Sequence, residues 1–301
     1  MTKKSMNAAV SLLALAAMAG GPALAADPGA VDEPIKLAML EWTGAQIAGK
    51  VQEKADYKVD YVTAGNYPHF QGLADGDVAA SVGIWLNNVG DIYPKVLAEG
   101  KFEDIGSLGL ATNEGSLYPK FMEELCPALP SWEALNDPEC VALLAMPDTL
   151  PNGRFLDYPA DWGSRAATII LDNNLPLTAT PSGSEGAQLA ELRAAAAAKT
   201  PLVMMFWAPH FILAEGETGW IGMPPCKDQS NEHCIMPPDV NKVVWSGFVP
   251  KWPAAYEITT EDQQKMMLAI DEKGQSLDLV TTERVAAHEA IWRPWLDQAL
   301  N

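Results

Sequence analysis

Residues 35–51, with the sequence IKLAMLEWTGAQIAGKV, indicate the fold class most clearly. Its first part, residues 35–41, is a short apolar run and predicts a buried strand. Thr43 can then cap a helix over residues 44–55, whose apolar residues recur on one face. A second strand is expected at Lys58–Val62. Strand, helix and strand in this order predict a parallel sheet covered by helices on both faces.

This alternation continues along the chain. Further elements are expected as helices at 70–73, 91–99, 164–171, 184–198, 259–277 and 281–300, and as strands at 78–85 and 141–146. The layout fits an α/β protein of two lobes joined by a hinge, with crossings near Tyr118–Pro119 and Trp207–Phe211. We therefore expect residues 32–117 plus 211–301 in lobe 1 and residues 118–210 in lobe 2.

The first 25 residues have the features of a secretory signal peptide. Lys3 and Lys4 precede an apolar run over residues 8–17, and residues 23–25 (Ala-Leu-Ala) form a small-residue cleavage site. The apolar run is too short to span a bilayer, so we expect a periplasmic mature protein. Loss of the two lysines changes the formal net charge from −19 to −21. So acidic a chain is a poor candidate for binding nucleic acid or an anionic membrane surface.

Four cysteines lie in two local pairs. In an exported chain this arrangement predicts the disulfides Cys126–Cys140 and Cys226–Cys234. The alternative makes Cys226, His233 and Cys234 metal ligands, but no second ligand pair with zinc-like spacing follows. We therefore predict disulfides and no metal site.

The chain contains ten tryptophans, an unusually rich supply of rings. Four stand where a strand or loop gives way to the next element: Trp42, Trp85, Trp162 and Trp207. Trp162 follows an Asp-Tyr-Pro segment, residues 157–159, which is expected as a turn. Ligands of open α/β sheets bind at the carboxyl ends of strands, and clustered rings bind methylated ammonium groups. These four therefore predict an aromatic cage for such a ligand. The other six are expected in the core: Trp132, Trp220, Trp245, Trp252, Trp292 and Trp295.

Ordered segments of the chain resemble one known family. They are LEWTG (40–44), LADGDV (73–78) with GIWLN (83–87), and FWAPH (206–210). Together they resemble the substrate-binding proteins of glycine betaine/choline/proline-type ABC transporters. The resemblance implies a two-lobed periplasmic binding protein of type II, without a cofactor. We expect a monomer that closes on its ligand and delivers it to a membrane permease.

The same resemblance implies where the ligand is held. Family members enclose a trimethylammonium group in an aromatic box, which here falls on Trp42, Trp85 and Trp207. Tyr118 matches an aromatic position that some branches use. Glu114 and Asp157 are the acidic candidates for ligand contact.

The choice of ligand follows from the polar residues. In the choline-binding branch an acidic residue follows the first box aromatic by two positions, where this chain has Gly44. Glycine betaine and carnitine have a carboxylate that needs donors, whereas the expected cleft segments carry mostly acids. Trimethylamine N-oxide needs a tight cage with one acid or a few donors. The chain looks most like the family members that bind trimethylamine N-oxide, with glycine betaine ranked second and choline third.

An enzyme is the rival class. The sequence shows no nucleophile elbow, because residues 182–186 resemble a helix cap, and it shows no Gly-rich phosphate loop. A secreted hydrolase with dispersed catalytic residues is the remaining alternative, and turnover of a chromogenic ester or glycoside would support it. We predict a binding protein.

Overall fold

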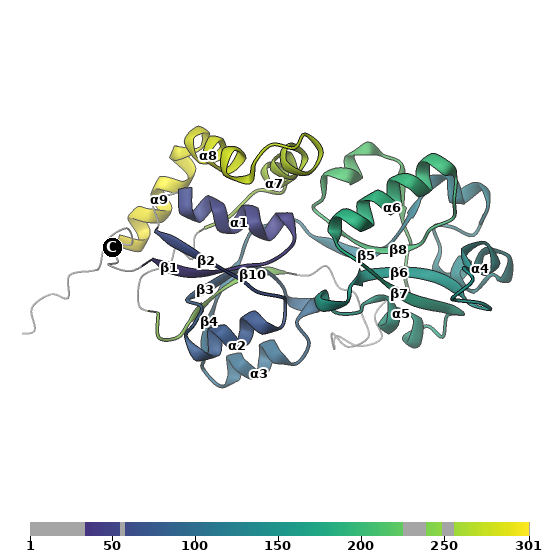
Figure 1. The fold of residues 1–301 in the computed structure, drawn as a ribbon, viewed down its shortest axis with the longest axis horizontal. Helices are drawn as coiled ribbons and strands as arrows, with labels where there is room; N and C mark the ends of the chain where they lie inside the picture. The colour runs from purple at the N-terminus through teal and green to yellow at the C-terminus, as the bar shows by residue number, and fades with distance from the viewer. Residues whose placement is uncertain (1–33, 55–57, 225–238, 249–255, 301) are drawn as a thin grey trace, which may run out of the picture.

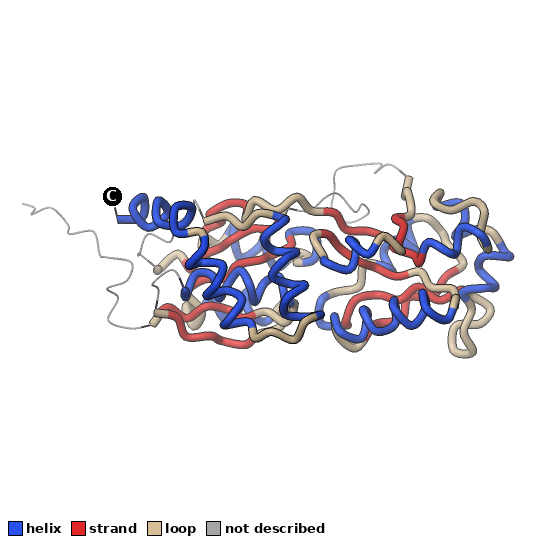
Figure 2. The backbone as a smooth tube through the Cα atoms, turned by 90° about the horizontal axis from the view of Figure 1, so that it is seen from above, coloured by secondary structure: helices blue, strands red, loops and turns tan. Residues whose placement is uncertain are grey.

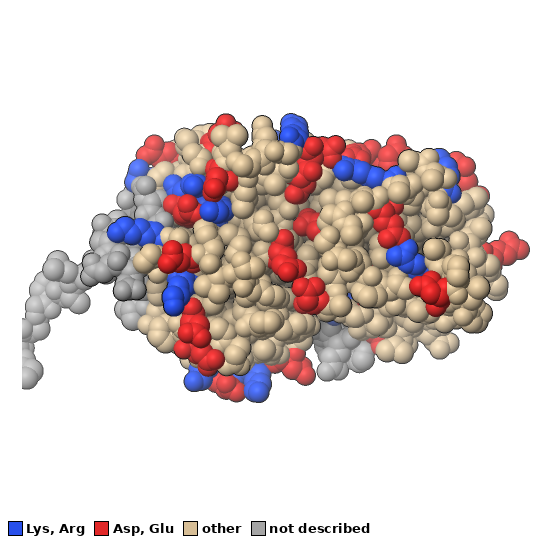
Figure 3. Space-filling model, in the orientation of Figure 1, with Lys and Arg blue, Asp and Glu red and all other residues tan. Residues whose placement is uncertain are grey.

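The structure is a computed structural model that describes residues 34–54, 58–224, 239–248 and 256–300, with side chains up to residue 294. The predicted signal peptide and the predicted disulfide Cys226–Cys234 lie outside these residues. Within them, no helix has the length and apolar character needed to cross a membrane. The molecule is elongated, and each half contains one sheet (Figures 1 and 2). Acidic side chains lie over both halves of the face in Figure 3.

The first sheet has the strand order β2-β1-β3-β10-β4. β1 pairs in parallel with β2 and β3, whereas β10 is antiparallel to β3 and β4. The strands are β1 (Ile35–Met39), β2 (Val59–Thr63), β3 (Ala80–Trp85), β4 (Phe102–Ser107) and β10 (Val240–Trp245). This sheet and its flanking helices are called the first lobe.

The helices of the first lobe cover both faces of its sheet (Figure 1). On one face lie α1 (Thr43–Lys54), α7 (Thr260–Met267), the π-helical turn η6 (Leu268–Glu272) and α8 (Leu277–Ala287), and α9 (Glu289–Leu300) follows. On the other lie α2 (Pro68–Asp75) and α3 (Ile92–Ala98). In α1 the predicted apolar face is buried, at positions 45, 47, 48 and 51.

One glycine sets how closely α1 lies on the sheet. Gly83 of β3 has a φ of +82°, and a Cβ there would come within 3.2 Å of the Ala45 Cα atom. Only glycine combines this backbone conformation with so close an approach. The contact brings the start of α1 next to the end of β3, and these are the places that carry Trp42 and Trp85.

The second sheet repeats the arrangement of the first, in the order β7-β6-β8-β5-β9. Among the described strands of this sheet, β5 is antiparallel to both of its neighbours, β8 and β9, whereas β6 pairs in parallel with β7 and β8. Like β10 in the first sheet, β5 is second from the edge. The strands are β5 (Asn113–Pro119), β6 (Gly153–Pro159), β7 (Leu177–Ser182), β8 (Met204–Ala208) and β9 (Thr218–Trp220). Helix α6 (Glu185–Ala198) covers one face, α5 (Ala166–Asp172) the other, and α4 (Pro138–Leu144) lies at the far end (Figure 1). This half is called the second lobe.

Short 3-10 turns complete the connections: η1 (Leu86–Asn88), η2 (Lys120–Glu124), η3 (Trp132–Asn136), η4 (Ala160–Trp162) and η5 (Phe211–Glu215).

The predicted class, two α/β lobes with helices flanking each sheet, is confirmed. The chain changes sheet between Ser107 and Asn113 and between Trp220 and Val240. The predicted lobe boundaries at 117/118 and 210/211 stay a proposal. Strand β5, which spans the first of these boundaries, and strand β9, which follows the second, both pair within the second sheet.

Two local predictions were wrong. Residues 141–146 were expected as a strand, but residues 138–144 form α4, because Asp137 caps the helix by accepting from the Glu139 N–H at 2.8 Å and Pro138 suits its first turn. The Asp-Tyr-Pro segment expected as a turn is instead the end of β6. Of the six tryptophans expected in the core, Trp292 is buried, whereas three are half-buried: Trp132, Trp220 and Trp245. Trp252 and the side chain of Trp295 lie outside the described part.

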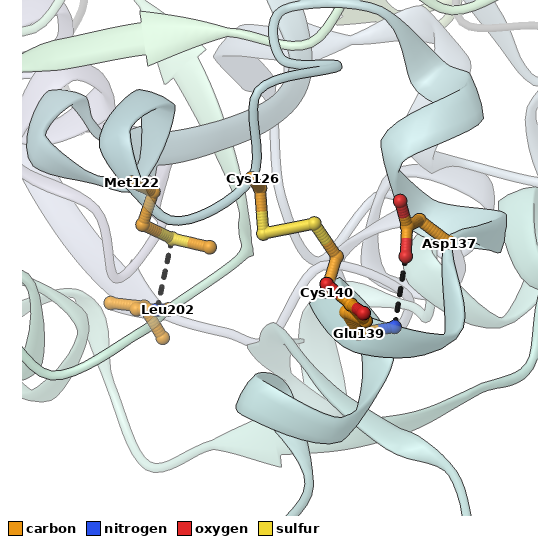
Figure 4. The surroundings of a disulfide bond; sticks show 6 residues. All are labelled: Met122, Cys126, Asp137, Glu139, Cys140 and Leu202. Carbon is orange, nitrogen blue, oxygen red and sulfur yellow. Dashed lines mark hydrogen bonds between the residues drawn. A yellow bond between two sulfur atoms is a disulfide. The ribbon is translucent and has the colours of Figure 1, made fainter.

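The predicted disulfide Cys126–Cys140 is confirmed, with Cα atoms 5.5 Å apart (Figure 4). It joins the segment after η2 to α4, beside Met122, whose sulfur accepts a hydrogen bond from the Leu202 N–H at 3.3 Å. The bond therefore ties a peripheral helix to the second lobe.

Replacing both of these cysteines with alanine should lower the free energy of unfolding by about 3 kcal/mol, because the bond closes a loop of about 15 residues in the unfolded chain. Denaturant unfolding of the wild type and the double variant measures this. Ligand affinity should not change, because neither cysteine lines the cavity described below. Equal unfolding midpoints would contradict the stabilising role.

Candidate functional site

A cavity lies where the two lobes meet, and aromatic rings form most of its wall. Its lining residues are Trp42, Asn66, Trp85, Asn88, Glu114, Tyr158, Trp162 and Trp207. The cavity volume is about 30 Å³, so the cavity is small and suits a compact group. The four tryptophans predicted as a cage are thus brought together at one cavity, and each is at most 9% exposed.

The ends of strands position these rings from both lobes. Trp42 lies between β1 and α1, and Trp85 is the last residue of β3, so both come from the first lobe. Trp207 lies near the end of β8, and Trp162 ends η4 directly after β6, so these two come from the second lobe. The cavity is therefore complete only when the lobes are together.

The rings meet mainly edge to face. The Trp42 and Trp162 centroids are 5.3 Å apart with planes at 68°, and Trp162 and Trp207 are 5.6 Å apart at 66°. Tyr158 lies 5.8 Å from Trp207 and 6.0 Å from Trp162. Such packing is the favoured geometry of aromatic pairs, so the rings hold one another in place. Trp162 is central, because it touches rings from both lobes.

Glu114 of β5 supplies the carboxyl group in the cavity wall. The Asn88 side-chain amide donates to its Oε1 at 2.9 Å, and the Asn87 amide donates to its Oε2. Burial raises the pKa of Glu114, and the opposing effects come first from the charge of Arg165 and then from these amides and Tyr158. The pKa of the Tyr158 hydroxyl is raised well above 10, by burial and by the charge of Glu114. The phenol is therefore neutral and can donate a hydrogen bond beside the carboxyl group.

Two of the predicted contact residues do not line the cavity. Asp157 instead holds the start of α5, since its carboxylate accepts from the N–H groups of Arg165 at 3.2 Å and Ala166 at 3.1 Å. Tyr118 is buried near the end of β5, where its hydroxyl donates to Glu123 at 2.9 Å. Its ring also packs against Gly219 of β9. Both residues therefore make contacts within the second lobe.

Three lining residues were missed from the sequence: Asn66, Asn88 and Tyr158. Asn66 donates to the backbone oxygens of Asn88 at 2.9 Å and Trp162 at 3.4 Å, so it links the lobes at the cavity wall. Tyr158 directly follows the chosen Asp157, and successive strand residues point to opposite faces. Recognition of β6 as a strand would have separated their roles. The two asparagines carry no local signal, because their positions depend on contacts across the lobes.

Polar contacts also join the lobes beside the cage. The Trp162 Nε1–H donates to Glu41 at 3.3 Å, and the Thr43 N–H donates to Glu185 Oε2 at 3.0 Å. The Thr43 hydroxyl donates to Asp271 of η6 at 2.9 Å. Burial, and then the charge of Glu185, raise the pKa of Asp271 from 3.8 to about 6, against smaller opposing effects of Thr43 and His210.

Replacing Asp271 with asparagine should stabilise the protein increasingly as the pH rises from 5 through about 6, and by a constant amount from there to pH 7.5. A raised pKa means that Asp271 stabilises the folded state in its protonated form, and this contribution is lost as the pH rises through about 6. Asparagine keeps an acceptor for Thr43 without the charge. Melting temperatures across this pH range measure the effect. The control is Asp278→Asn, since the Lys50 ammonium lowers the pKa of Asp278 and its titration lies below this range. A pH-independent offset for Asp271→Asn would contradict the assignment.

The described residues contain no group of three or more His, Cys, Asp or Glu side chains arranged to hold a metal ion. The alternative ligands Cys226, His233 and Cys234 lie outside the described part of the chain.

Comparison with known proteins places the fold and the site in context. Residues 33–288 match the family model of the substrate-binding domain of ABC-type glycine betaine transport systems. The trimethylamine N-oxide-binding protein of Pelagibacter ubique (strain HTCC1062) is 28% identical over 280 residues, covering 88% of this chain and 87% of that protein.

Solved structures share the fold at low sequence identity. Lactococcal OpuAC, in its closed conformation with glycine betaine, has a TM-score of 0.70 at 18% identity, covering 88% of this chain and 100% of that chain. The glycine betaine/L-proline-binding protein ProX of Borrelia burgdorferi has a TM-score of 0.73 at 17% identity, covering 89% and 100%. Because the family model spans most of the chain, this protein belongs to the substrate-binding domains of ABC-type glycine betaine transport systems, which are binding components and not enzymes.

Proposed function

We propose that this protein is the periplasmic solute-binding component of an ABC importer and that it captures trimethylamine N-oxide in the cage of Trp42, Trp85, Trp162 and Trp207. The observation that carries the proposal is the convergence of these rings, with one buried carboxyl group, on a small cavity between the lobes. The Pelagibacter ubique relative, named for binding trimethylamine N-oxide, supports the choice of ligand.

The cage supplies most of the binding free energy. Indole faces attract N-methyl groups that carry positive charge, at about 2 kcal/mol or more per ring when the contact is desolvated. Four rings can together supply the ~8 kcal/mol that micromolar binding requires. Because two rings come from each lobe, only the closed form offers all of them, and the ligand selects that form.

Glu114 and Tyr158 bind the oxide. The raised pKa of Glu114 favours its protonated form, in which the carboxyl group can donate to the oxide oxygen. Tyr158 brings a second neutral donor to the same wall. A dipolar ligand with three methyl groups and one small acceptor matches four rings and these donors.

The remaining methylated amines fit less well. Choline would need a fixed negative partner, but position 44 is glycine, and a Cβ there would come within 2.7 Å of the Gln263 amide nitrogen. Glycine betaine would bring a buried carboxylate, which needs charged or several N–H donors. None of the eight described lining residues is Lys or Arg. We therefore rank glycine betaine second and choline third, with carnitine also a competitor.

The sequence and the family together support a cellular location and a partner for this protein. We propose that residues 1–25 direct export and are removed, that the mature protein works as a monomer, and that it passes its ligand to a membrane permease. Its family membership supports the permease as a partner.

A fluorescence titration tests the proposal. Trimethylamine N-oxide should change the intrinsic tryptophan emission with a saturable, 1:1 concentration dependence, because the ligand would touch four indoles. Choline, glycine betaine and carnitine serve as competitors. No spectral change with any of the four compounds would contradict the aromatic cage.

A further inference from the structure

Two inter-lobe hydrogen bonds flank one ring of the cage. The residue before Trp42, Glu41, accepts from the Trp162 Nε1–H at 3.3 Å. The residue after it, Thr43, donates its backbone N–H to Glu185 at 3.0 Å. The first bond runs from the second lobe to the first, and the second runs the other way. Trp42 is thus held between two reciprocal contacts that exist only when the lobes are together.

The carboxylate of Glu185 is held in a fixed orientation by His210. The His210 Nδ1 atom accepts from the Ile212 N–H at 3.2 Å, so the ring proton is on Nε2. That Nε2–H faces Glu185 Oε1 at 3.2 Å, which leaves Oε2 for Thr43. Both residues are buried: His210 is not exposed to solvent, and Glu185 is 8% exposed. The ring and the carboxylate therefore form a prepared acceptor on the second lobe.

The position of this acceptor adds an electrostatic contribution. Thr43 is the first residue of α1 and Glu185 the first of α6, so the two helix N-termini meet at one carboxylate (Figure 1). The positive end of a helix dipole favours a negative group there. In an open form, the N-terminus of α1 would lose this partner. Arg193 of α6 also pairs with Glu272 across the lobes at 2.5 Å, but this pair is exposed and so contributes little.

We propose that Glu185, oriented by His210, is a positioning residue that clasps the N-terminus of α1 when the lobes close and thereby fixes Trp42 in the cage. This inference rests on the proposed function, because it assigns the clasp to retention of the ligand. It predicts that loss of the clasp speeds ligand release while the separate lobes keep their folds. Association should change little, because the ligand enters the open form, in which the clasp is absent, and only the minority of ligand-free molecules that close form it.

Glu185→Gln is the sharpest test, because the variant has the same shape. Two N–H donors face Glu185, and glutamine offers one acceptor oxygen and turns its own NH2 toward the other donor. With trimethylamine N-oxide as the probe, stopped-flow tryptophan fluorescence should show dissociation at least tenfold faster than in the wild type. Glu185→Asp keeps the charge but shortens the reach to Thr43, and it should also release faster. The control is Glu191→Gln, on the same helix, whose partner Arg154 lies within the second lobe.

The outcomes separate the clasp from the proposed function. Faster release in both Glu185 variants, with unchanged melting temperatures in the absence of ligand and no effect of Glu191→Gln, supports the clasp. Unchanged release in either Glu185 variant overturns it, even if the wild type binds the probe. If the wild type binds none of the methylated amines, that failure belongs to the proposed function. Small-angle scattering of the ligand-free proteins then decides the clasp, which requires the wild type to be more compact than Glu185→Gln.

Discussion

Replacing Trp162 with alanine should weaken the binding of trimethylamine N-oxide by about a hundredfold. The ring has a central place in the cage, with its centroid 5.3 Å from Trp42 of the first lobe and 5.6 Å from Trp207 of its own lobe. Its loss removes one desolvated cation–π contact of about 2 kcal/mol, and it removes the inter-lobe hydrogen bond to Glu41. Calorimetric titration of the wild type and the variant measures the difference.

The control for this experiment is Trp132→Ala. Trp132 is half-buried in η3 of the same lobe and does not line the cavity, so its loss should lower stability without changing affinity. If Trp162→Ala kept the affinity and lost mainly thermal stability, the ring would belong to the core of the second lobe. This result would exclude Trp162 from the proposed cage.

Replacing Glu114 with alanine should have an effect of similar size, about a hundredfold. The variant removes the donor to the oxide and leaves the amides of Asn87 and Asn88 without their buried partner. Glu114→Gln should bind within a few-fold of the wild type, because its amide can donate to the oxide. The Oδ1 atoms of Asn87 and Asn88 have no hydrogen-bond partner among the described residues, so either amide can turn to fit the new side chain.

The pH dependence distinguishes a protonated Glu114 from a charged one. Its pKa is raised by burial, so the protonated form that binds the oxide is present at low pH and is lost as the pH rises through that pKa. Wild-type affinity should therefore fall as the pH rises, and the affinity of Glu114→Gln should stay level. Calorimetry at several pH values measures both. Affinity that rises with pH in the wild type would show that the carboxylate acts through its charge. The control is Glu123→Gln, because Glu123 accepts a hydrogen bond from the Tyr118 hydroxyl and does not line the cavity.

The meeting of the tryptophans at one cavity was easier to predict from the sequence than the polar part of the cavity wall. Trp42, Trp85 and Trp207 follow apolar runs, and side chains at strand ends meet at one edge of a parallel sheet, so local pattern was sufficient. Asp157 was chosen as an acid of an expected cleft segment, in an Asp-Tyr-Pro sequence interpreted as a turn. The segment instead ends the buried strand β6, and Tyr158 lines the cavity. Proline after an extended residue suits both structures, so the local sequence could not separate them.

Other features depend on contacts between distant parts of the chain. Residues 141–146 are an apolar run too short to distinguish strand from helix, and the cap at Asp137 decided for α4. Asn66 and Asn88 have no periodic pattern that marks them. Thr43 and Glu185 are 142 residues apart, and no local rule pairs a helix start in one lobe with a helix start in the other. Contacts of this kind follow from how the lobes meet.

Isothermal calorimetry of the purified protein against trimethylamine N-oxide, glycine betaine, choline and carnitine under identical conditions tests the proposed ligand most directly. We expect trimethylamine N-oxide to bind most tightly, with one site and micromolar or better affinity, glycine betaine to bind more weakly and choline more weakly still. Tighter binding of choline or glycine betaine, or no heat with any of the four, would contradict the assignment of the cage to trimethylamine N-oxide.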